Sequence, residues 1–446
     1  MTSTVPSTGP QRGNAGRRDL ARARLIAATC AILIVAACSS DSSAVANRWQ
    51  TVTDTIGDTI VIRTPGASDL RAPARLVREL SIGELEGPDE YQFANVASIL
   101  PAPHGGVYVW DETTTQLRQY DSAGTYLRDV GRKGGGPGEY QYLNGLGVLP
   151  DGRILTWDAR LQRINAYDTA GTMISSWRAN SRLLMDNGLT VDTAGNVYLF
   201  DLLDPPDPGN PDGERRSGYI RLAAGDPDSR DTLVLPYVGP EPPTLTATGM
   251  SGKSRVSSLS AVPFAPAPFG FMGPAGYFVT AMGDRYAVTL HRPEGPLRIE
   301  RDLAPTPVSP EERKDAEDRM VATMHQIDAA WKWTGPRIPD VKPAIRTLEV
   351  GADGRIWIGR SMPGERIPEH EIVEPRTGEP RSVPPRRWRE PVAYDVFSLD
   401  GHYLGMVPVP PRTTLLYRRG DIAWGVVRDS LDVPFVTRFR IEWPPR

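Results

Sequence analysis

Apolar and polar positions in the first half of the chain recur as a repeating unit of short strands. Residues Asn144 to Asp158 align without gaps to residues Asn187 to Asp201, and Asn95 to Asp111 follow the same pattern with two extra residues. Each copy predicts a strand, a glycine turn, and a strand of β-branched and aromatic residues that ends in Asp. In the units that begin at Asn95 and Asn144, a third strand follows, ends in another glycine turn and leads into a fourth strand. Four short strands per unit are typical of a propeller blade.

Weaker copies of this unit continue towards the C-terminus. Phe269 to Val279, Ile345 to Ile358 and Thr414 to Val427 each contain a glycine turn, which makes six units in all. The last unit lacks one strand of its own. We expect Leu76 to Ile82, ahead of the first unit, to pair with the last blade and close the ring, because closure removes exposed edges. Thr51 to Arg63 is a further strand pair whose position the pattern does not determine. The sequence therefore predicts an all-β fold, a six-bladed β-propeller.

The segment between the first two units carries a distinctive string. Residues 131–140, with the sequence GRKGGGPGEY, resemble the Gly-Pro-Gly-Glu-aromatic linker between blades of the NHL-like six-bladed β-propeller family of bacterial lipoproteins. The resemblance covers about residues 76–446 and is strongest over residues 90–201, whereas the later units lack the linker and carry long insertions. It implies a propeller fold and an extracytoplasmic setting, but no single reaction.

Insertions are unevenly distributed between the two ends of the predicted strands. The first-to-second and third-to-fourth turns are short, and nearly every insertion falls in a second-to-third or a blade-to-blade loop, two kinds of loop that share one face of a propeller. Long loops on one face are typical of a binding face, although drift in tolerant loops is an alternative explanation. The long insertions are residues 202–217, 237–268, 305–343 and 361–390.

One insertion, between the fourth and fifth blades, predicts a helix at about residues 309–333. Ser309 is a candidate N-cap, Pro310 occupies the first helical position, and Glu312 completes a capping box. Apolar side chains then recur at intervals of three and four residues: Met320, Met324, Ile327 and Trp331. This stripe predicts either a lid over the mouth of the central channel or packing against neighbouring loops.

The N-terminal segment resembles an export signal. Residues 1–24 contain five arginines, and Leu25 to Ala37 run without a charge into Cys38. This run is short for a bilayer-spanning helix, which needs about 20 residues, and its Val-Ala-Ala-Cys end resembles the bacterial lipoprotein box. An ordinary signal or anchor segment is the alternative. We expect three parts: a lipoprotein signal peptide at residues 1–37, a flexible tether at 38–48, and a single propeller domain at 49–446.

Composition narrows the class of protein further. The chain of 446 residues has two cysteines. Cys30 would leave with the signal peptide and Cys38 would carry lipid, so the fold must hold without a disulfide bond. The 43 glycines and 43 prolines suit many tight turns. A formal net charge of −3 gives no electrostatic reason to expect a nucleic-acid partner.

Polar residues recur at the start of each innermost strand, where a propeller places them around the mouth of its central channel. Counting back eight residues from each glycine turn, or ten in the first unit, selects Asn95, Asn144, Asn187, Pro268, Arg346 and Arg412. Amides and guanidiniums together suit a carboxylate, a sugar, or a metal with neutral oxygen ligands, for which calcium is the candidate cofactor. Turn geometry before a strand is the alternative explanation.

Acidic residues end the second strands on the same face. The second strands of the units end in Asp111, Asp158, Asp201 and Arg360. Carboxylates at this position can act as acid–base groups or calcium ligands, but they also commonly cap their own backbone. The sequence leaves both interpretations open.

Other catalytic signatures are missing from the sequence. The five histidines lie in different units without a paired zinc spacing, and no nucleophile elbow, Walker loop or dinucleotide fingerprint occurs. We therefore expect an extracytoplasmic binding module, held to the membrane by its N-terminal lipid, for a polar or anionic ligand or an envelope protein. Two alternatives remain. One is a metal-dependent lactonase- or lyase-like enzyme that uses the Asn residues at the channel mouth and one or two of the Asp residues. The other is a structural subunit of an envelope complex.

Overall fold

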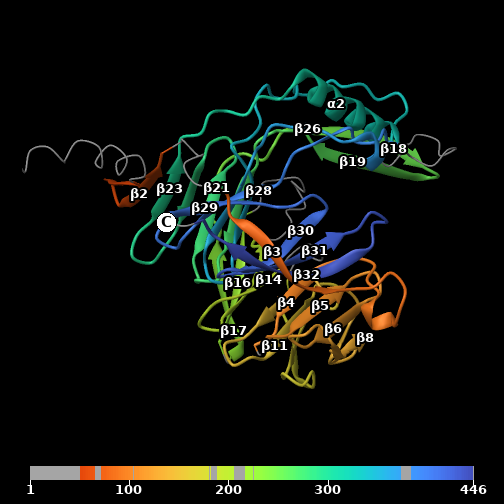
Figure 1. Cartoon of the computed structure of the whole chain (residues 1–446), viewed down its shortest axis with the longest axis vertical. Coiled ribbons are helices and arrows are strands. Elements are labelled where there is room, and N and C mark those ends of the chain that lie inside the picture. Colours follow the sequence, from red (N-terminus) through yellow and green to blue (C-terminus); the bar gives the residue numbers. More distant parts are fainter. Residues whose placement is uncertain are drawn as a thin grey trace, which may run out of the picture. The chain divides into compact units, whose positions relative to one another are not determined.

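The computed structural model shows a chain built mainly of antiparallel four-stranded sheets (Figure 1). It describes residues 51–65, 72–103, 105–179, 181, 188–204, 216–224, 226–372 and 383–444. The predicted signal peptide, Cys38 and Asn187 lie outside these ranges. Within them, no helix is long and apolar enough to cross a membrane.

The first two blades follow the predicted unit strand by strand. Gly152 closes the first turn of blade 2 at φ +87°, where glycine is unstrained, and its amide donates to the Leu149 carbonyl oxygen at 2.9 Å. Blade 1 consists of β4 (Val96–Pro101), β5 (Val107–Asp111), β6 (Gln116–Tyr120) and β7 (Tyr126–Asp129), and blade 2 of β10 (Gly145–Val148), β11 (Ile154–Asp158), β12 (Arg163–Tyr167) and β13 (Met173–Arg178).

The remaining blades keep this strand order and add insertions. Blade 3 consists of β14 (Leu189–Val191), β15 (Val197–Leu202), β16 (Ser217–Ala223) and β17 (Asp226–Val234), and blade 4 of β20 (Pro268–Met272), β21 (Phe278–Met282), β22 (Ala287–Leu290) and β23 (Leu297–Arg301). Blade 5 consists of β24 (Ile345–Val350), β25 (Ile356–Arg360), β28 (Ala393–Phe397) and β29 (Tyr403–Pro408), and blade 6 of β30 (Thr413–Arg419), β31 (Ile422–Arg428) and β32 (Pro434–Glu442).

The N-terminal strand β3 (Arg75–Ile82) completes blade 6, as the sequence predicts. It pairs antiparallel with β32, from Arg75 opposite Glu442 to Ile82 opposite Val436. A bulge interrupts this register between Arg78 and Leu80. The first described blade strand and the last strand of the chain therefore share one sheet, which closes the ring without a free edge on β32.

Apolar clusters fill every interface between neighbouring blades. Six clusters of the described residues join blades 1 and 2, 2 and 3, 3 and 4, 4 and 5, 5 and 6, and 6 and 1. Trp110 meets Tyr140 edge to face in the first of these clusters, with 5.3 Å between the ring centroids. Ile82 and Trp424 belong to the last cluster, between blades 6 and 1. Because these clusters join each blade to the next and blade 6 to blade 1, the architecture is a six-bladed β-propeller.

Close approach at the centre of the ring depends on glycine. A side chain on Gly145 in β10 would collide with the backbone nitrogen of Leu189 in β14. The innermost strands of blades 2 and 3 thus lie next to each other because residue 145 has no Cβ.

The hairpin at residues 52–64, which the sequence pattern did not place, extends blade 4. Its strands are β1 (Val52–Ile56) and β2 (Thr59–Thr64), and β2 pairs parallel with β23. Blade 4 is therefore a six-stranded sheet. Val61 is fully buried, whereas Ile56 and Ile60 stay exposed.

Short elements occupy the connections between and within blades. In the string at 131–140, Tyr140 inserts between blades 1 and 2, where its hydroxyl donates to the Val130 carbonyl oxygen at 3.0 Å. The short elements are η3 (Asp89–Tyr91), β8 (Arg132–Lys133), β9 (Glu139–Tyr140), β26 (Glu365–Arg366), η4 (Glu369–Glu371) and β27 (Trp388–Arg389).

A buried ion pair joins blades 4 and 5 at their interface. Arg301 of β23 donates to Asp395 of β28 at 2.7 Å, and both side chains are almost fully buried. The hydroxyls of Tyr286 and Tyr403 donate to the same carboxylate at 2.8 and 3.0 Å. Burial, together with this negative charge, raises the pKa of both tyrosines above the usual value, so they remain neutral hydrogen-bond donors.

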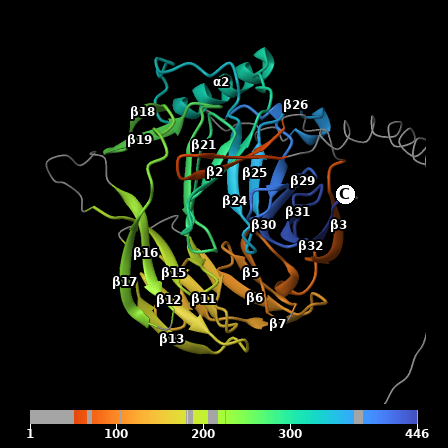
Figure 2. The ribbon, with the colours of Figure 1, turned by 90° about the vertical axis from the view of Figure 1, so that its left-hand side faces the viewer.

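Two blade-to-blade insertions fold together into a separate layer, which we name the cap. It contains the hairpin β18 (Thr244–Ser251) and β19 (Ser254–Ala261), inserted between blades 3 and 4, and helix α2 (Pro310–His325), inserted between blades 4 and 5. Figures 1 and 2 both show α2 beside β18 and β19. The cap has its own apolar cluster, built from Leu245, Ala247, Val262, Met324 and Ile338 with Met320, Ile327 and Trp331 packed against it.

The helix agrees with the sequence at its start and differs at its end. Ser309 Oγ accepts a hydrogen bond from the Glu312 amide at 3.1 Å, as an N-cap should. The α-helix ends at His325, because Gln326 to Ala330 form turns, so the predicted span to residue 333 is too long. Of the two predicted roles for its apolar stripe, packing against a neighbouring insertion is the one observed. The predicted capping box is only half formed, because the Glu312 carboxylate accepts from Lys342 at 2.6 Å.

Candidate functional site

The Asp residues that end β5 and β11 are buried carboxylates that bind backbone amides. Asp158 accepts four amide hydrogen bonds at 2.6–3.0 Å, from Gln141, Tyr142, Arg160 and Leu161. Asp111 accepts the four equivalent ones at 2.7–3.3 Å, from Ala94, Asn95, Thr113 and Thr114. Each carboxylate holds the incoming blade-to-blade loop against the turn that follows its own strand. These contacts occupy both oxygens of each side chain.

We expect Asp158→Ala to lower the free energy of unfolding by about 2–3 kcal/mol, because buried amides lose their acceptor. Chemical denaturation would measure the loss. Asp168→Ala is the matched control in the same blade, since Asp168 also accepts two amides, at 2.9 and 2.8 Å, but in an exposed turn. Equal losses in the two variants would contradict a special role for the buried carboxylate.

The predicted polar residues at the starts of the innermost strands make their contacts within their own blades. Asn144 Oδ1 accepts from the Ala159 amide at 2.9 Å, and Asn95 Nδ2 donates to the Glu112 carboxylate. Arg412 is exposed and donates to the Asp429 carbonyl oxygen.

Two further predicted positions lie in blades 3 and 4. Asp201, at the end of β15, is buried, and its Oδ1 accepts from the Leu202 amide at 2.9 Å. Pro268 is the first residue of β20. Asn187 is not among the described residues. The contacts described for the predicted ring thus tie side chains to their own blades rather than to one another.

Two of the residues singled out in the sequence line cavities: Arg360 lines one that is described below, and Arg346, the second residue of β24, lines another. This cavity, which we name the cap pocket, has a volume of about 640 Å³ and lies between α2, the starts of β20 and β24, and the segment 386–392. Phe264, Phe269 and Trp388 contribute aromatic surface to it. The guanidiniums and carboxylates on its wall are those of Arg319, Arg346, Arg386, Arg389, Glu312, Asp315 and Glu390.

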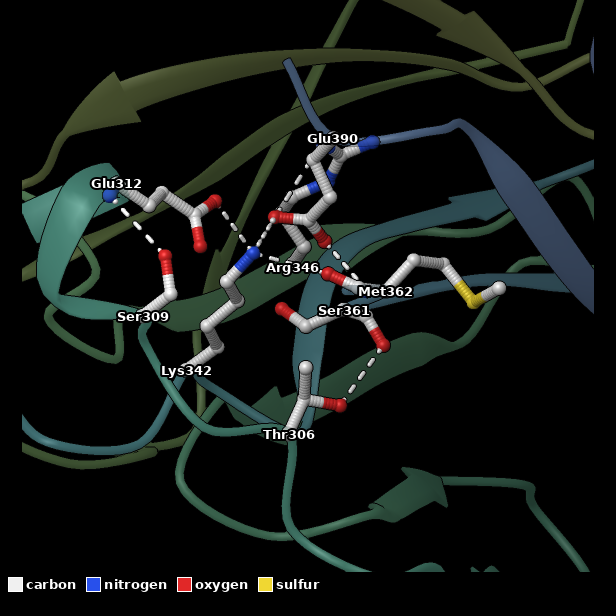
Figure 3. Close-up of polar contacts among 8 residues, drawn as sticks. All are labelled: Thr306, Ser309, Glu312, Lys342, Arg346, Ser361, Met362 and Glu390. Atoms are coloured by element: carbon white, nitrogen blue, oxygen red, sulfur yellow. Dashed lines mark hydrogen bonds and ion pairs between the residues drawn. The ribbon is translucent and has the colours of Figure 1, made fainter. Parts of the chain in front are cut away.

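A buried lysine pairs with two carboxylates, those of Glu312 and Glu390, that line the cap pocket (Figure 3). Lys342 Nζ donates to Glu312 Oε1 at 2.6 Å and to the Met362 carbonyl oxygen at 2.9 Å, and it lies 3.4 Å from Glu390 Oε2. The Lys342 side chain is 0% exposed, and those of Glu312 and Glu390 are 6% and 9% exposed. This cluster ties the first turn of α2 to both ends of the 361–390 insertion of blade 5.

Arg346 shares one of these carboxylates and keeps unused donors. Its Nη1 lies 4.0 Å from Glu390 Oε2, which Lys342 also contacts. Its Nε is buried and has no hydrogen-bond partner among the described residues, and the side chain is 31% exposed. A partly exposed guanidinium at a cavity wall suits an oxyanion group, because its N–H fork matches carboxylate and phosphate oxygens.

Guanidiniums also gather where α2 meets the segment 383–390. Arg319 Nη1 donates to the Pro384 carbonyl oxygen at 2.7 Å, and Arg389 pairs with Glu371. Burial lowers the pKa of Arg319, and the positive charge of Arg386 lowers it further. The effect of the Arg386 charge on Arg319 indicates an electropositive part of the pocket.

A second cavity of about 710 Å³ adjoins the first, between β2, the segment 284–287 and residues 300–306. Pro343 and Ser361 line both cavities and so form part of the wall between them, whereas Lys342 lines the second cavity. We take the cap pocket as the candidate site because it combines aromatic surface, Arg346 and the guanidiniums of Arg319 and Arg386.

The described residues do not offer a ready metal site. No group of three or more His, Cys, Asp or Glu side chains among them is close enough to hold a metal ion. Asp111 and Asp158 are occupied by amides, and Lys342 pairs with both Glu312 and Glu390. The donor set therefore does not fit calcium at these positions, and calcium stays an untested prediction.

Sequence reasoning missed most of the cap pocket. Phe264, Arg319 and Trp388 lie in insertions that have no counterpart in the other blades, so no repeat aligns them. The available signal was the placement of the long insertions on one face. The structure confirms that pattern, since the insertions follow β15, β17, β23 and β25, which all end on that face.

Comparison with known proteins bears on the fold. Residues 76–204 match a family described as a 6-bladed β-propeller. No curated protein matches the sequence. Solved structures that resemble the chain include a protein of Bacteroides fragilis described as exported, at 9% identity and a TM-score of 0.45 over 86% of this chain and 99% of that one.

Two enzymes are also among the similar structures. A gluconolactonase from Xanthomonas campestris has 13% identity and a TM-score of 0.37 over 84% of this chain and 97% of its own. A catalytically inactive virginiamycin B lyase from Staphylococcus aureus has 10% identity and a TM-score of 0.37 over 82% of this chain and 99% of its own. Six blades, ring closure by β3 and the family match over residues 76–204 together establish that this chain is a six-bladed β-propeller.

Proposed function

We propose that this chain is an extracytoplasmic, lipid-anchored binding protein that holds an anionic or polar ligand in the cap pocket. The observation that carries the proposal is Arg346, whose partly exposed side chain lines the pocket beside aromatic surface and lies 4.0 Å from the Glu390 carboxylate that Lys342 already contacts. Aromatic faces and a guanidinium together suit a ring that bears a carboxylate or another oxyanion. The cap then serves to build the binding face.

Binding tests this proposal directly. D-galacturonate and benzoate place one carboxylate on a sugar ring and on an aromatic ring, and titration calorimetry measures their affinity. We expect at least one of them to bind, and Arg346→Gln to weaken that binding about tenfold, the effect of losing a charge-assisted hydrogen bond. Arg153→Gln is the matched control, because Arg153 pairs with Asp151 on the face with short turns. Equal affinity of Arg346→Gln and wild type would refute the site.

The alternative of a metal-dependent enzyme makes a different prediction. A calcium ligand set would stabilise the folded chain in proportion to the calcium concentration over its dissociation constant. Under the binding proposal, calcium and chelator leave the melting temperature of a soluble chain that starts at residue 46 unchanged. A rise of several degrees with calcium, together with one calcium per chain by elemental analysis, would favour the enzyme.

Membrane anchoring rests on the sequence around Cys38, where an arginine-rich segment and an apolar run precede Ala36-Ala37-Cys38. We expect the protein, expressed in a bacterium with the N-terminal segment intact, to partition into a detergent phase and to carry acyl chains by mass spectrometry. Cys38→Ser should move it to the aqueous phase. Cys30→Ser is the control and should change nothing. An unmodified Cys38 in the exported protein would disprove lipid anchoring.

A further inference from the structure

The cap pocket has a second basic position besides Arg346, built from two elements that meet at one side of the cavity. Arg319 comes from α2 and Arg386 from the segment before β27, and both side chains line the pocket. The hydrogen bond from Arg319 Nη1 to the Pro384 carbonyl oxygen ties α2 to that segment two residues from Arg386. The Arg319 side chain is therefore held in place, while Arg386 is exposed to solvent.

The charge at this position is only partly compensated. Asp315 is the carboxylate of α2 that acts on Arg319, and its Oδ1 also accepts the Arg387 amide at 3.1 Å. The other carboxylates of the pocket, those of Glu312 and Glu390, contact Lys342. Among the residues that the structure describes, Arg386 forms no ion pair. Two guanidiniums at one side of the cavity, of which Arg319 is under the positive charge of Arg386 and has one nearby carboxylate, favour an anion with more than one negative charge.

We propose that Arg319 and Arg386 form a subsite for a phosphate monoester group, at the side of the cap pocket where α2 meets the segment before β27. Planar guanidiniums bind phosphate oxygens through paired hydrogen bonds, and a dianionic phosphate matches the two positive charges. Trp388, two residues after Arg386, contributes aromatic surface to the same cavity. The ligand class is therefore a phosphorylated ring compound, such as a sugar phosphate. This inference rests on the proposed function, because it refines the ligand of the same pocket.

Titration calorimetry with inorganic phosphate and with glucose 1-phosphate, at constant ionic strength, tests the subsite. We expect both to bind wild type, and Arg386→Gln and Arg319→Gln each to weaken binding about tenfold, since each removes one charged donor. Arg366→Gln is the matched control in the same insertion, because Arg366 is 67% exposed and pairs with Glu369. Arg386 is exposed, so its variant leaves the fold intact, and circular dichroism confirms this.

Malonate separates a phosphate subsite from a dicarboxylate subsite. Weaker binding of malonate than of phosphate supports the proposal, whereas tighter binding of malonate with the same loss in Arg386→Gln overturns it in favour of a dicarboxylate. Unchanged phosphate affinity in both arginine variants also overturns it. If D-galacturonate or benzoate binds and neither phosphate compound does, the subsite is wrong and the proposed function stands. If no probe binds, both fail.

Discussion

Lys342→Met is expected to lower the free energy of unfolding by about 3–5 kcal/mol, because it leaves two buried carboxylates without their shared cation. The Lys342 side chain is 0% exposed and contacts both Glu312 and Glu390. Methionine keeps the length of the side chain, so the loss reports charge rather than a cavity. Denaturation by urea measures the change, and limited proteolysis shows whether the cap opens before the blades.

Two control variants make this result specific to the cluster. Lys314→Met removes an exposed pair with Asp318 on the same helix, where the lysine is 74% exposed, and such pairs contribute little. Replacing Lys342, Glu312 and Glu390 together by apolar residues should recover most of the stability, since a complete buried ionic cluster is often replaceable. A Lys342→Met protein as stable as Lys314→Met would mean that the cluster is hydrated rather than buried.

The blades were predictable because each is a local unit with its own signals. The glycine turns at 152 and 195, and the Asp residues at the ends of the second strands of blades 1 to 3, mark the same structural positions in those blades. The partner of β32 was also predictable, because a blade with three strands leaves an edge and the strand-like segment directly ahead of the first unit, Leu76 to Ile82, can cover it. The position of the hairpin β1–β2 was not predictable, since the parallel pairing of β2 with β23 joins segments more than 200 residues apart and no rule of connection requires it.

The candidate site was predictable only in part, for a physical reason. Counting from the glycine turns identified Arg346, because β24 keeps the repeat register. The same count selected Asn144, whose side chain accepts the Ala159 amide and so serves the turn. The repeat pattern did not identify Arg319 and Trp388, because they belong to insertions. The contacts of an insertion are set by tertiary packing and not by the repeat of the blades. The apolar core of the cap around Met324 arises in the same way, because it forms where two separate insertions pack against each other.

A chain that lacks β3 is expected to lose the folded monomer, which is the largest effect predicted for any change to this protein. Without Arg75 to Ile82, blade 6 has three strands, β32 becomes an exposed edge, and the cluster between blades 6 and 1 loses Ile82, which is 2% exposed. Each large apolar side chain removed from that interface costs about 1.5–3 kcal/mol, and an open edge of nine residues promotes association. Size-exclusion chromatography of residues 84–446 should therefore show aggregates.

A circular permutant separates the missing strand from the shortened chain. Arg75 lies opposite Glu442 in the register of β3 and β32, so a short glycine-serine linker after Arg446 can lead directly into residues 73–83. This permutant contains residues 84–446 followed by that strand, lacks β1 and β2 just as the truncated chain does, and differs from it by the linker and the returned strand. We expect it to be monomeric and to unfold cooperatively. The reason is that antiparallel pairing with β32 needs the strand itself and not its original place in the sequence. A permutant that aggregates like the truncated chain would show that ring closure by β3 does not hold the propeller together.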